Sequence, residues 1–155
     1  MKRQTGFTLL ELMVVIAILG ILAATSVGVM AKYRQRTIGS EAAVMMKQII
    51  EAEIIYFLAH NEFFPSSADS DEILVWHNGA DPSTANQQRA LDALKVAIPT
   101  GHLLGFRIYR DPVDSVGSPL TVEIWSSGNF NLFPGVHQIR GTVDKDGKIT
   151  GPESF

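Results

Sequence analysis

The sequence predicts an α+β fold, in which one long N-terminal helix packs with its second half on a small antiparallel β-sheet. Three observations support this prediction. Residues 12–31 carry no charge, the following residues up to about Ala59 repeat apolar side chains at helical spacing, and the C-terminal part alternates apolar and polar residues between turn-forming residues. The chain has 155 residues, which is the length of one ordinary domain with an extra element.

The composition argues against several classes of protein. Charged residues make up 19% of the chain and apolar residues 46%, which argues against disorder, and a formal net charge of −3 does not indicate nucleic acid as a partner. The absence of cysteine excludes disulfide bonds, thiolate metal sites and cysteine nucleophiles. The four histidines are scattered and no Ser/His/Asp arrangement stands out, so we do not expect an enzyme.

The uncharged run of residues 12–31 is long enough for a membrane-spanning helix, because about 20 helical residues cross a hydrocarbon core of roughly 30 Å. The alternative is a cleaved secretory signal, whose apolar region has about 7 to 15 residues and ends at small residues such as those at 22–26. Glu11 precedes this run directly, and an ionised carboxylate in lipid is costly unless it is paired. Such a carboxylate usually marks a function.

The stretch TGFTLLELMVVIAILGILAA, residues 5–24, resembles the N-terminal prepilin motif of type IV pilins and of type II secretion pseudopilins. The resemblance implies a leader peptide of residues 1–6, cleavage between Gly6 and Phe7 by a prepilin peptidase, and N-methylation of Phe7. It also implies a pilin-like fold and a division of the mature chain. Residues 7–31 would form the transmembrane and filament-core helix, and residues 32–155 the globular head, which includes the amphipathic half of the helix.

The resemblance gives Glu11 a role in assembly. In the family, the corresponding glutamate meets the N-terminal amine of a neighbouring subunit and sets the axial register of the filament. Cleavage before Phe7 would create an α-amino group one helical turn from Glu11. The alternative is that Glu11 lies at the membrane interface, where an acid favours the positive end of the helix dipole.

The resemblance also implies partners and a location. The chain would be a single-pass protein of the inner (cytoplasmic) membrane, with its head on the periplasmic or extracellular side, and would then join a filament at the cell surface or in the periplasm. The partners would be other subunits of the filament, the prepilin peptidase, the inner-membrane assembly platform and, before assembly, membrane lipid. The sequence does not indicate whether nucleic acid is bound.

Three functions are compatible with these features. The first is a structural subunit of a type IV pilus-like filament. The second is a pseudopilin of a type II secretion system, because residues 111–128 resemble a looser form of the major pseudopilin pattern and the C-terminal cysteine pair of many pilins is absent. The third is a membrane-anchored adhesive or binding domain that never polymerises.

The predicted long helix extends from near Phe7 to about Ala59. Three glycines inside it, Gly20, Gly28 and Gly39, reduce its stability by roughly 1 kcal/mol each relative to alanine. Asn61 is expected to end it, before Pro65. Its second half carries an apolar stripe formed by Ala42, Met45, Met46, Ile49, Ile50, Ile54, Phe57 and Leu58.

Residues 87–98 repeat apolar side chains at helical spacing and predict a second, short helix, with Asp81 or Ser83 as its N-cap. The segments after it are rich in β-forming residues and are separated by Gly, Pro, Asn and Asp. They predict a sheet of three or four strands. The expected strands are residues 104–110, 120–127, 136–143 and 148–151.

A calcium loop is a weaker prediction, at the C-terminal end. Asp144, Asp146 and Glu153 have the spacing of the third, fifth and twelfth positions of such a loop, but Thr142 stands where the first aspartate belongs. The alternative is a β-hairpin turn, for which Asp-Lys-Asp-Gly is suitable. We expect no other cofactor.

Overall fold

The computed structural model describes residues 7–66, 72–100, 103–110, 118–127 and 130–154. Its contacts divide the chain into two units, Met1–Arg34 and Gln35–Phe155. The predicted leader, including Gly6, and the first part of the pseudopilin-like stretch, residues 111–117, lie outside the described residues.

The predicted long helix is confirmed as α1, Leu9–His60. It ends as expected, because Asn61 adopts a left-handed conformation with a φ of 59° and its backbone N–H donates to the carbonyl oxygen of Phe57 at 2.7 Å. Within α1 an N-terminal apolar stretch is long and apolar enough to cross a membrane. The second half of α1 belongs to the Gln35–Phe155 unit.

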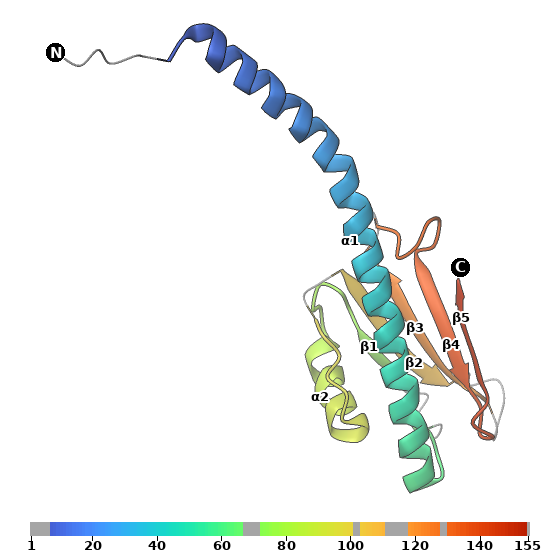
Figure 1. The fold of residues 1–155 in the computed structure, drawn as a ribbon. Helices are drawn as coiled ribbons and strands as arrows, with labels where there is room; N and C mark the ends of the chain where they lie inside the picture. The colour runs from blue at the N-terminus through green and yellow to red at the C-terminus, as the bar shows by residue number, and fades with distance from the viewer. Residues whose placement is uncertain (1–6, 67–71, 101–102, 111–117, 128–129, 155) are drawn as a thin grey trace. The chain divides into compact units, whose positions relative to one another are not determined.

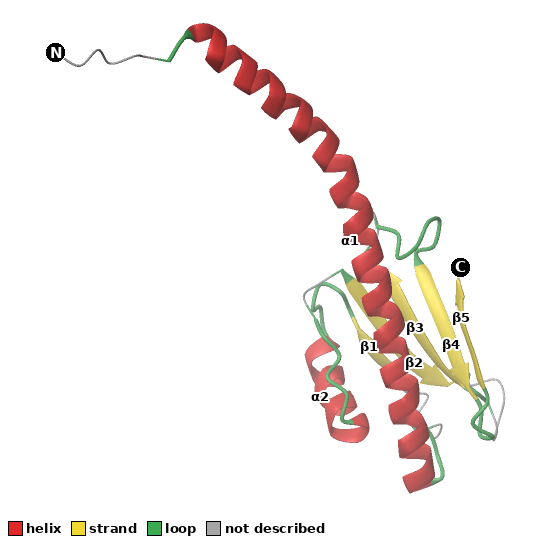
Figure 2. Cartoon of the chain, viewed as in Figure 1, coloured by secondary structure: helices red, strands yellow, loops and turns green. Residues whose placement is uncertain are grey.

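One antiparallel sheet forms the other layer of this unit. Its five strands follow one another in chain order, and α1 runs across one of its faces (Figure 1, Figure 2). The α+β prediction is confirmed, and the sheet has one strand more than the three or four expected. The additional strand is β1, which was not predicted because it has only three residues and shows no alternation over that length. The strands are β1 Ile73–Val75, β2 Leu104–Arg110, β3 Leu120–Ser126, β4 Gln138–Val143 and β5 Ile149–Ser154.

The core of the unit lies between α1 and the sheet. The predicted apolar stripe of α1 is buried at its centre, where Met46, Ile49 and Ile50 belong to one hydrophobic cluster with strand residues such as Phe106 and Ile124. Leu58 was expected in this stripe but is 79% exposed, because it lies on the opposite face of the helix. A charged residue, Glu53, occupies the stripe instead.

Gly39 has a packing role that its helix propensity does not reveal. It is buried, and a Cβ atom built there would collide with the backbone carbonyl oxygen of Leu132. A Cβ atom on Gly141 of β4 would lie 2.9 Å from Cδ1 of Ile50 and 3.0 Å from Sδ of Met46. At Gly39, α1 therefore approaches the backbone of Leu132 more closely than a larger residue permits, whereas at Gly141 the ends of the Ile50 and Met46 side chains fill the space.

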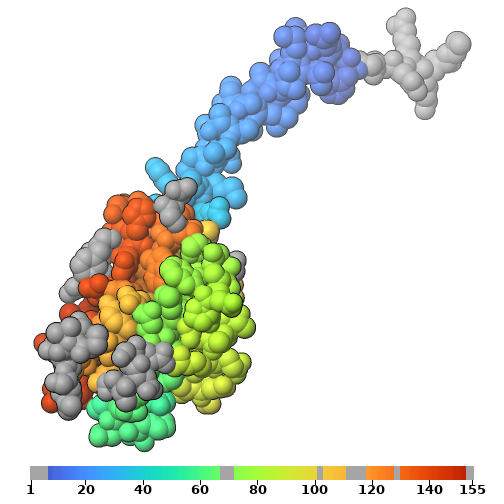
Figure 3. Space-filling view, turned by 180° about the vertical axis from the view of Figure 1, so that it is seen from behind, coloured from blue at the N-terminus to red at the C-terminus, as the bar shows by residue number. Residues whose placement is uncertain are grey.

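The second helix, α2 Ser83–Leu94, packs beside β1, and the two lie next to each other in the space-filling view (Figure 3). It begins and ends four residues earlier than predicted. The predicted cap by Asp81 or Ser83 is wrong: Pro82 is the N-cap, and the hydroxyl of Ser83 instead accepts a hydrogen bond from the backbone N–H of Trp76 at 2.8 Å. The helix stops at Lys95, which is left-handed with a φ of 58°.

Replacing Lys95 with glycine is expected to stabilise the Gln35–Phe155 unit by about 0.5–1 kcal/mol, because glycine adopts the left-handed conformation without a steric cost. Urea unfolding of the full chain in detergent measures the change. It can be followed by tryptophan fluorescence, since both tryptophans, Trp76 and Trp125, lie in this unit. The control is Lys95→Ala, which removes the same side chain but keeps a Cβ atom in the left-handed conformation. It should not stabilise the unit. Equal effects of the two variants would contradict the explanation.

Candidate processing and assembly site

The predicted processing and assembly residues lie at the N-terminal end of α1. Phe7 precedes the helix and is exposed, and Glu11 is in its first turn. Glu11 is the only charged residue in the stretch 7–31. This segment has no contact that buries its apolar side chains, so the Met1–Arg34 unit presents an apolar helix with one carboxylate near its start.

Thr8 and Glu11 form a reciprocal cap at the start of α1. The backbone N–H and the hydroxyl of Thr8 both donate to Oε2 of Glu11 at 2.9 Å, and the backbone N–H of Glu11 donates to the Thr8 hydroxyl at 3.2 Å. This is a capping box, which satisfies N–H groups that the helix leaves unpaired. The Thr-x-x-Glu spacing at residues 8–11 is a sequence signal for this motif.

The capping box holds the carboxylate at a defined place on the helix. Both bonds that Glu11 accepts end on Oε2, and no described residue bonds to Oε1. An oxygen in this position can accept a hydrogen bond from a cation supplied by another molecule. The structure thus brings Glu11 and Phe7 to the same helix end, while Gly6 lies outside the described residues.

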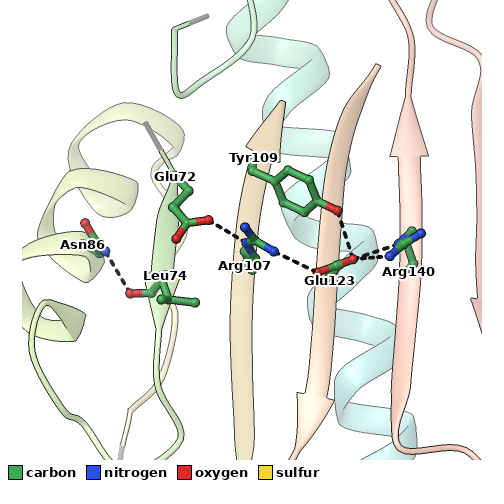
Figure 4. Close-up of polar contacts among 7 residues, drawn as sticks. All are labelled: Glu72, Leu74, Asn86, Arg107, Tyr109, Glu123 and Arg140. Atoms are coloured by element: carbon green, nitrogen blue, oxygen red, sulfur yellow. Dashed lines mark hydrogen bonds and ion pairs between the residues drawn. The ribbon is translucent and has the colours of Figure 1, made fainter. Parts of the chain in front are cut away.

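A row of alternating charges crosses the sheet on the face opposite α1 (Figure 4). Arg107 of β2 pairs with Glu72 at 2.6 Å and with Glu123 of β3 at 3.8 Å, and Arg140 of β4 pairs with Glu123 at 2.6 Å. The hydroxyl of Tyr109 also donates to Glu123, at 3.0 Å. These contacts satisfy a carboxylate that is buried on the sheet, so the row has a structural explanation.

Glu53 is the polar residue that the sequence analysis missed. Its side chain is fully buried, and its Oε2 accepts a hydrogen bond from the backbone N–H of Phe64 at 3.0 Å. Oε1 has no partner among the described residues. Burial raises the pKa of Glu53 to about 8, although the Phe64 N–H and the positive charge of Arg110 both oppose the shift. The sequence does contain a signal for this burial. Glu53 follows Ile49 by four residues and Ile50 by three, which places it on the same face of the helix as these apolar residues.

Two of the three predicted calcium ligands lie in one turn. Asp144 and Asp146 lie in the turn between β4 and β5, where Oδ1 of Asp144 accepts hydrogen bonds from the backbone N–H groups of Asp146 and Lys148 at 3.0 and 2.9 Å. Glu153 lies in β5 opposite Arg140. It is four residues beyond Ile149, or about 13 Å along the strand.

These hydrogen bonds are those of the alternative hairpin turn. No group of three or more His, Asp or Glu residues in the described part of the chain is arranged to hold a metal ion. Calcium binding by Asp144, Asp146 and Glu153 stays a prediction.

Comparison with known proteins gives two kinds of match. A family model described as "Prokaryotic N-terminal methylation motif" matches residues 1–27. Over almost its whole length, the chain is similar to the type II secretion system core protein G of Klebsiella pneumoniae: the two are 33% identical over 144 residues, which cover 93% of this chain and 83% of that protein.

The matches to pilins have a higher sequence identity than the match to protein G, but they cover a shorter part of the chain. A fimbrial protein of Neisseria meningitidis is 45% identical over 67 residues, which cover 43% of this chain and 39% of that protein. The type IV major pilin protein PilA of Myxococcus xanthus is 44% identical over 55 residues, 36% of this chain and 25% of that protein. The chain therefore matches well under half the length of these pilins. No solved structure matches it.

Proposed function

Because this chain belongs to the family of type IV pilins and type II secretion pseudopilins, we propose that it is a structural subunit of a type IV pilus-like filament. The observation that carries the proposal is the exposed apolar helix of residues 7–31 with Glu11 in its first turn. A large apolar surface of this kind requires a partner, either lipid or protein. A structural subunit meets lipid before assembly and other subunits afterwards.

The proposed order of events begins with processing. A prepilin peptidase removes residues 1–6 after Gly6 and methylates the new N-terminus at Phe7. Before assembly, the subunit is a single-pass protein of the inner membrane, with the Gln35–Phe155 unit on the periplasmic side. The assembly platform of that membrane then transfers it into a filament that lies in the periplasm or reaches the cell surface.

In the filament, packing of the apolar helices would supply the contact area between subunits. Glu11 would set their axial register. Lipid tails are as apolar as the helices, so association depends on close packing and on polar contacts rather than on hydrophobic burial. A carboxylate among apolar helices is stable only with a partner of opposite charge. The amine of Phe7 in a neighbouring subunit is that partner in our proposal.

A pseudopilus of a type II secretion system is the second candidate. One observation favours it: the similarity to type II secretion protein G extends over 93% of the chain, whereas the matches to the two pilins cover at most 43% of it. The Gln35–Phe155 unit as a whole thus has a relative among secretion proteins. Both candidates share the processing and assembly steps and differ in the machine that uses the filament.

Mass spectrometry of the mature chain tests the processing step. We expect a chain that begins with N-methylated Phe7 and lacks residues 1–6. Gly6→Val should leave the precursor intact, whereas Gly28→Ala, a glycine substitution outside the predicted junction, should be processed normally. A chain that still begins at Met1, or one cleaved within residues 22–26, would exclude the proposed function.

A further inference from the structure

Two apolar side chains on the outer face of α1 are largely exposed among the described residues of the Gln35–Phe155 unit. Ile55 is 68% exposed and Leu58 is 79% exposed. They are three residues apart, so they are neighbours on one side of the helix, close to its C-terminal end at His60. We call this pair the apolar knob.

An apolar groove lies on the same unit between α1 and the edge strand β5. Its volume is about 310 Å³, and its walls are Ala43, Met46 and Ile50 of α1 and Ile149, Gly151 and Pro152 of β5. Ile149 is half exposed, although it is β-branched and lies in a strand. The groove lies at the edge of the sheet, because β5 is the last strand in the sheet order. We call it the apolar slot.

The knob and the slot are at different places on the molecule. Leu58 follows Ile50 by eight residues, which is about 12 Å along a helix. One subunit can therefore use both surfaces at once, with different neighbours. A protruding apolar patch and a pocket elsewhere on the same molecule make a heterologous contact, and a contact of this kind repeats into a helical filament if it does not close into a ring.

The charged residues that lie next to the two surfaces in the chain are of opposite sign. Glu62 follows the knob by four residues, and Lys148 directly precedes Ile149 of the slot. Both are exposed. The slot itself is lined by a charged pair, Lys47 and Glu51, whose side chains lie 3.7 Å apart. Exposed charges at the rim of the slot favour a protein over lipid tails as its occupant.

We infer that the apolar knob of one subunit occupies the apolar slot of the next copy of the same chain in the filament, with Glu62 facing Lys148 across the contact. This inference rests on the proposed function and adds to it a contact between the Gln35–Phe155 units of neighbouring subunits. The contact is separate from the packing of residues 7–31. It would help to determine which neighbour a subunit meets.

Cysteine cross-linking of assembled filaments tests the inference, because the natural chain contains no cysteine. Leu58→Cys and Ile149→Cys are co-expressed as two single-cysteine chains, and the filaments are oxidised and separated on a non-reducing gel. We expect at least about tenfold more disulfide-linked dimer than from the control pair Leu91→Cys with Ile149→Cys, since a disulfide requires Cα atoms within about 7 Å. Leu91 is also an exposed leucine, but it lies on α2.

The outcomes separate the two proposals. Filaments in which the Leu58 and Leu91 pairs cross-link equally, or not at all, would exclude the knob-and-slot contact and leave the proposed function intact. If the cysteine-free chain itself forms no filament, the proposed function fails, and this inference fails with it.

A charge exchange gives an independent result. In the Leu58→Cys chain, Glu62→Lys should reduce cross-linking to Ile149→Cys, and Lys148→Glu in the second chain should restore it. Because the exchange keeps both surfaces exposed, it does not depend on a change in folding. Loss of cross-linking without restoration would contradict the inferred pairing of Glu62 with Lys148.

Discussion

Replacing Glu53 with glutamine is expected to raise the free energy of unfolding of the Gln35–Phe155 unit by about 3 kcal/mol near pH 7. Glutamine has the same shape and can accept the N–H of Phe64, but it carries no charge that burial would penalise. Urea unfolding of the full chain in detergent, followed by tryptophan fluorescence at several pH values, measures the difference between the natural chain and the variant.

The sign of the pH dependence follows from the direction of the shift. The pKa of Glu53 is raised from 4.5 to about 8, so between these values the folded chain keeps a proton that the unfolded chain has lost. Stability is therefore fully present below pH 4.5 and is lost as the pH rises towards 8, by about 1.4 kcal/mol per pH unit. Glu53→Gln should remove this loss, so the two chains should differ little near pH 4.5.

A neighbouring glutamate is the matched control. Glu51 is on the same helix but exposed, in a surface pair with Lys47, so Glu51→Gln should change stability by less than about 0.5 kcal/mol at any of these pH values. Comparing variants also cancels the titration of the other acidic groups. If the natural chain and Glu53→Gln lost stability in parallel between pH 4.5 and 8, the carboxylate of Glu53 would not be the cause.

Replacing Glu11 with alanine is expected to leave an inserted, folded subunit that almost never enters a filament. Removing one partner of a buried ion pair costs about 3–5 kcal/mol, which lowers the assembly equilibrium by at least about a hundredfold. The measurement is the fraction of the subunit in sheared, sedimented filaments relative to the fraction that stays in the membrane.

A second substitution separates the two roles of this side chain. Glu11→Gln removes the charge but keeps an oxygen that can accept the bonds from Thr8, so the capping box can persist. If pairing with an amine matters, the glutamine variant should fail to assemble as the alanine variant does. Normal filaments from Glu11→Gln would show that the helix cap, and not the charge, is what assembly requires. Asp92→Asn, an acid-to-amide change on α2, should assemble normally.

The long helix and four of the strands were predictable because their patterns are long. A stretch without charge over 12–31, a helical stripe in the second half of α1 and alternation over β2, β3 and β4 each repeat over several residues. Asn61 and Pro65 marked the end of α1 by their backbone chemistry. The assembly residues Phe7 and Glu11 came from the resemblance and from the cost of a charge in lipid.

Features that depend on tertiary contacts were not predictable. β1 is three residues long, and it is held by pairing with β2 and by contacts with α2. Ser83 seemed a suitable cap for α2, but its hydroxyl serves the backbone of Trp76. Polarity predicts a buried Leu58 and an exposed Glu53, but the structure shows the reverse. Hydropathy cannot show which side of the end of a helix the sheet still covers.

The glycine contacts of α1 have a mechanical consequence. Tension along a filament would enter the Gln35–Phe155 unit through α1, where the bare backbone of Gly39 lies against the carbonyl of Leu132. A few turns later, Met46 and Ile50 press on Gly141. Because no side chain separates the backbone of Gly39 from that of Leu132, there is little slack at this contact. A pull on α1 would therefore reach the backbone of Leu132 directly, whereas at β4 it would pass through the side chains of Met46 and Ile50.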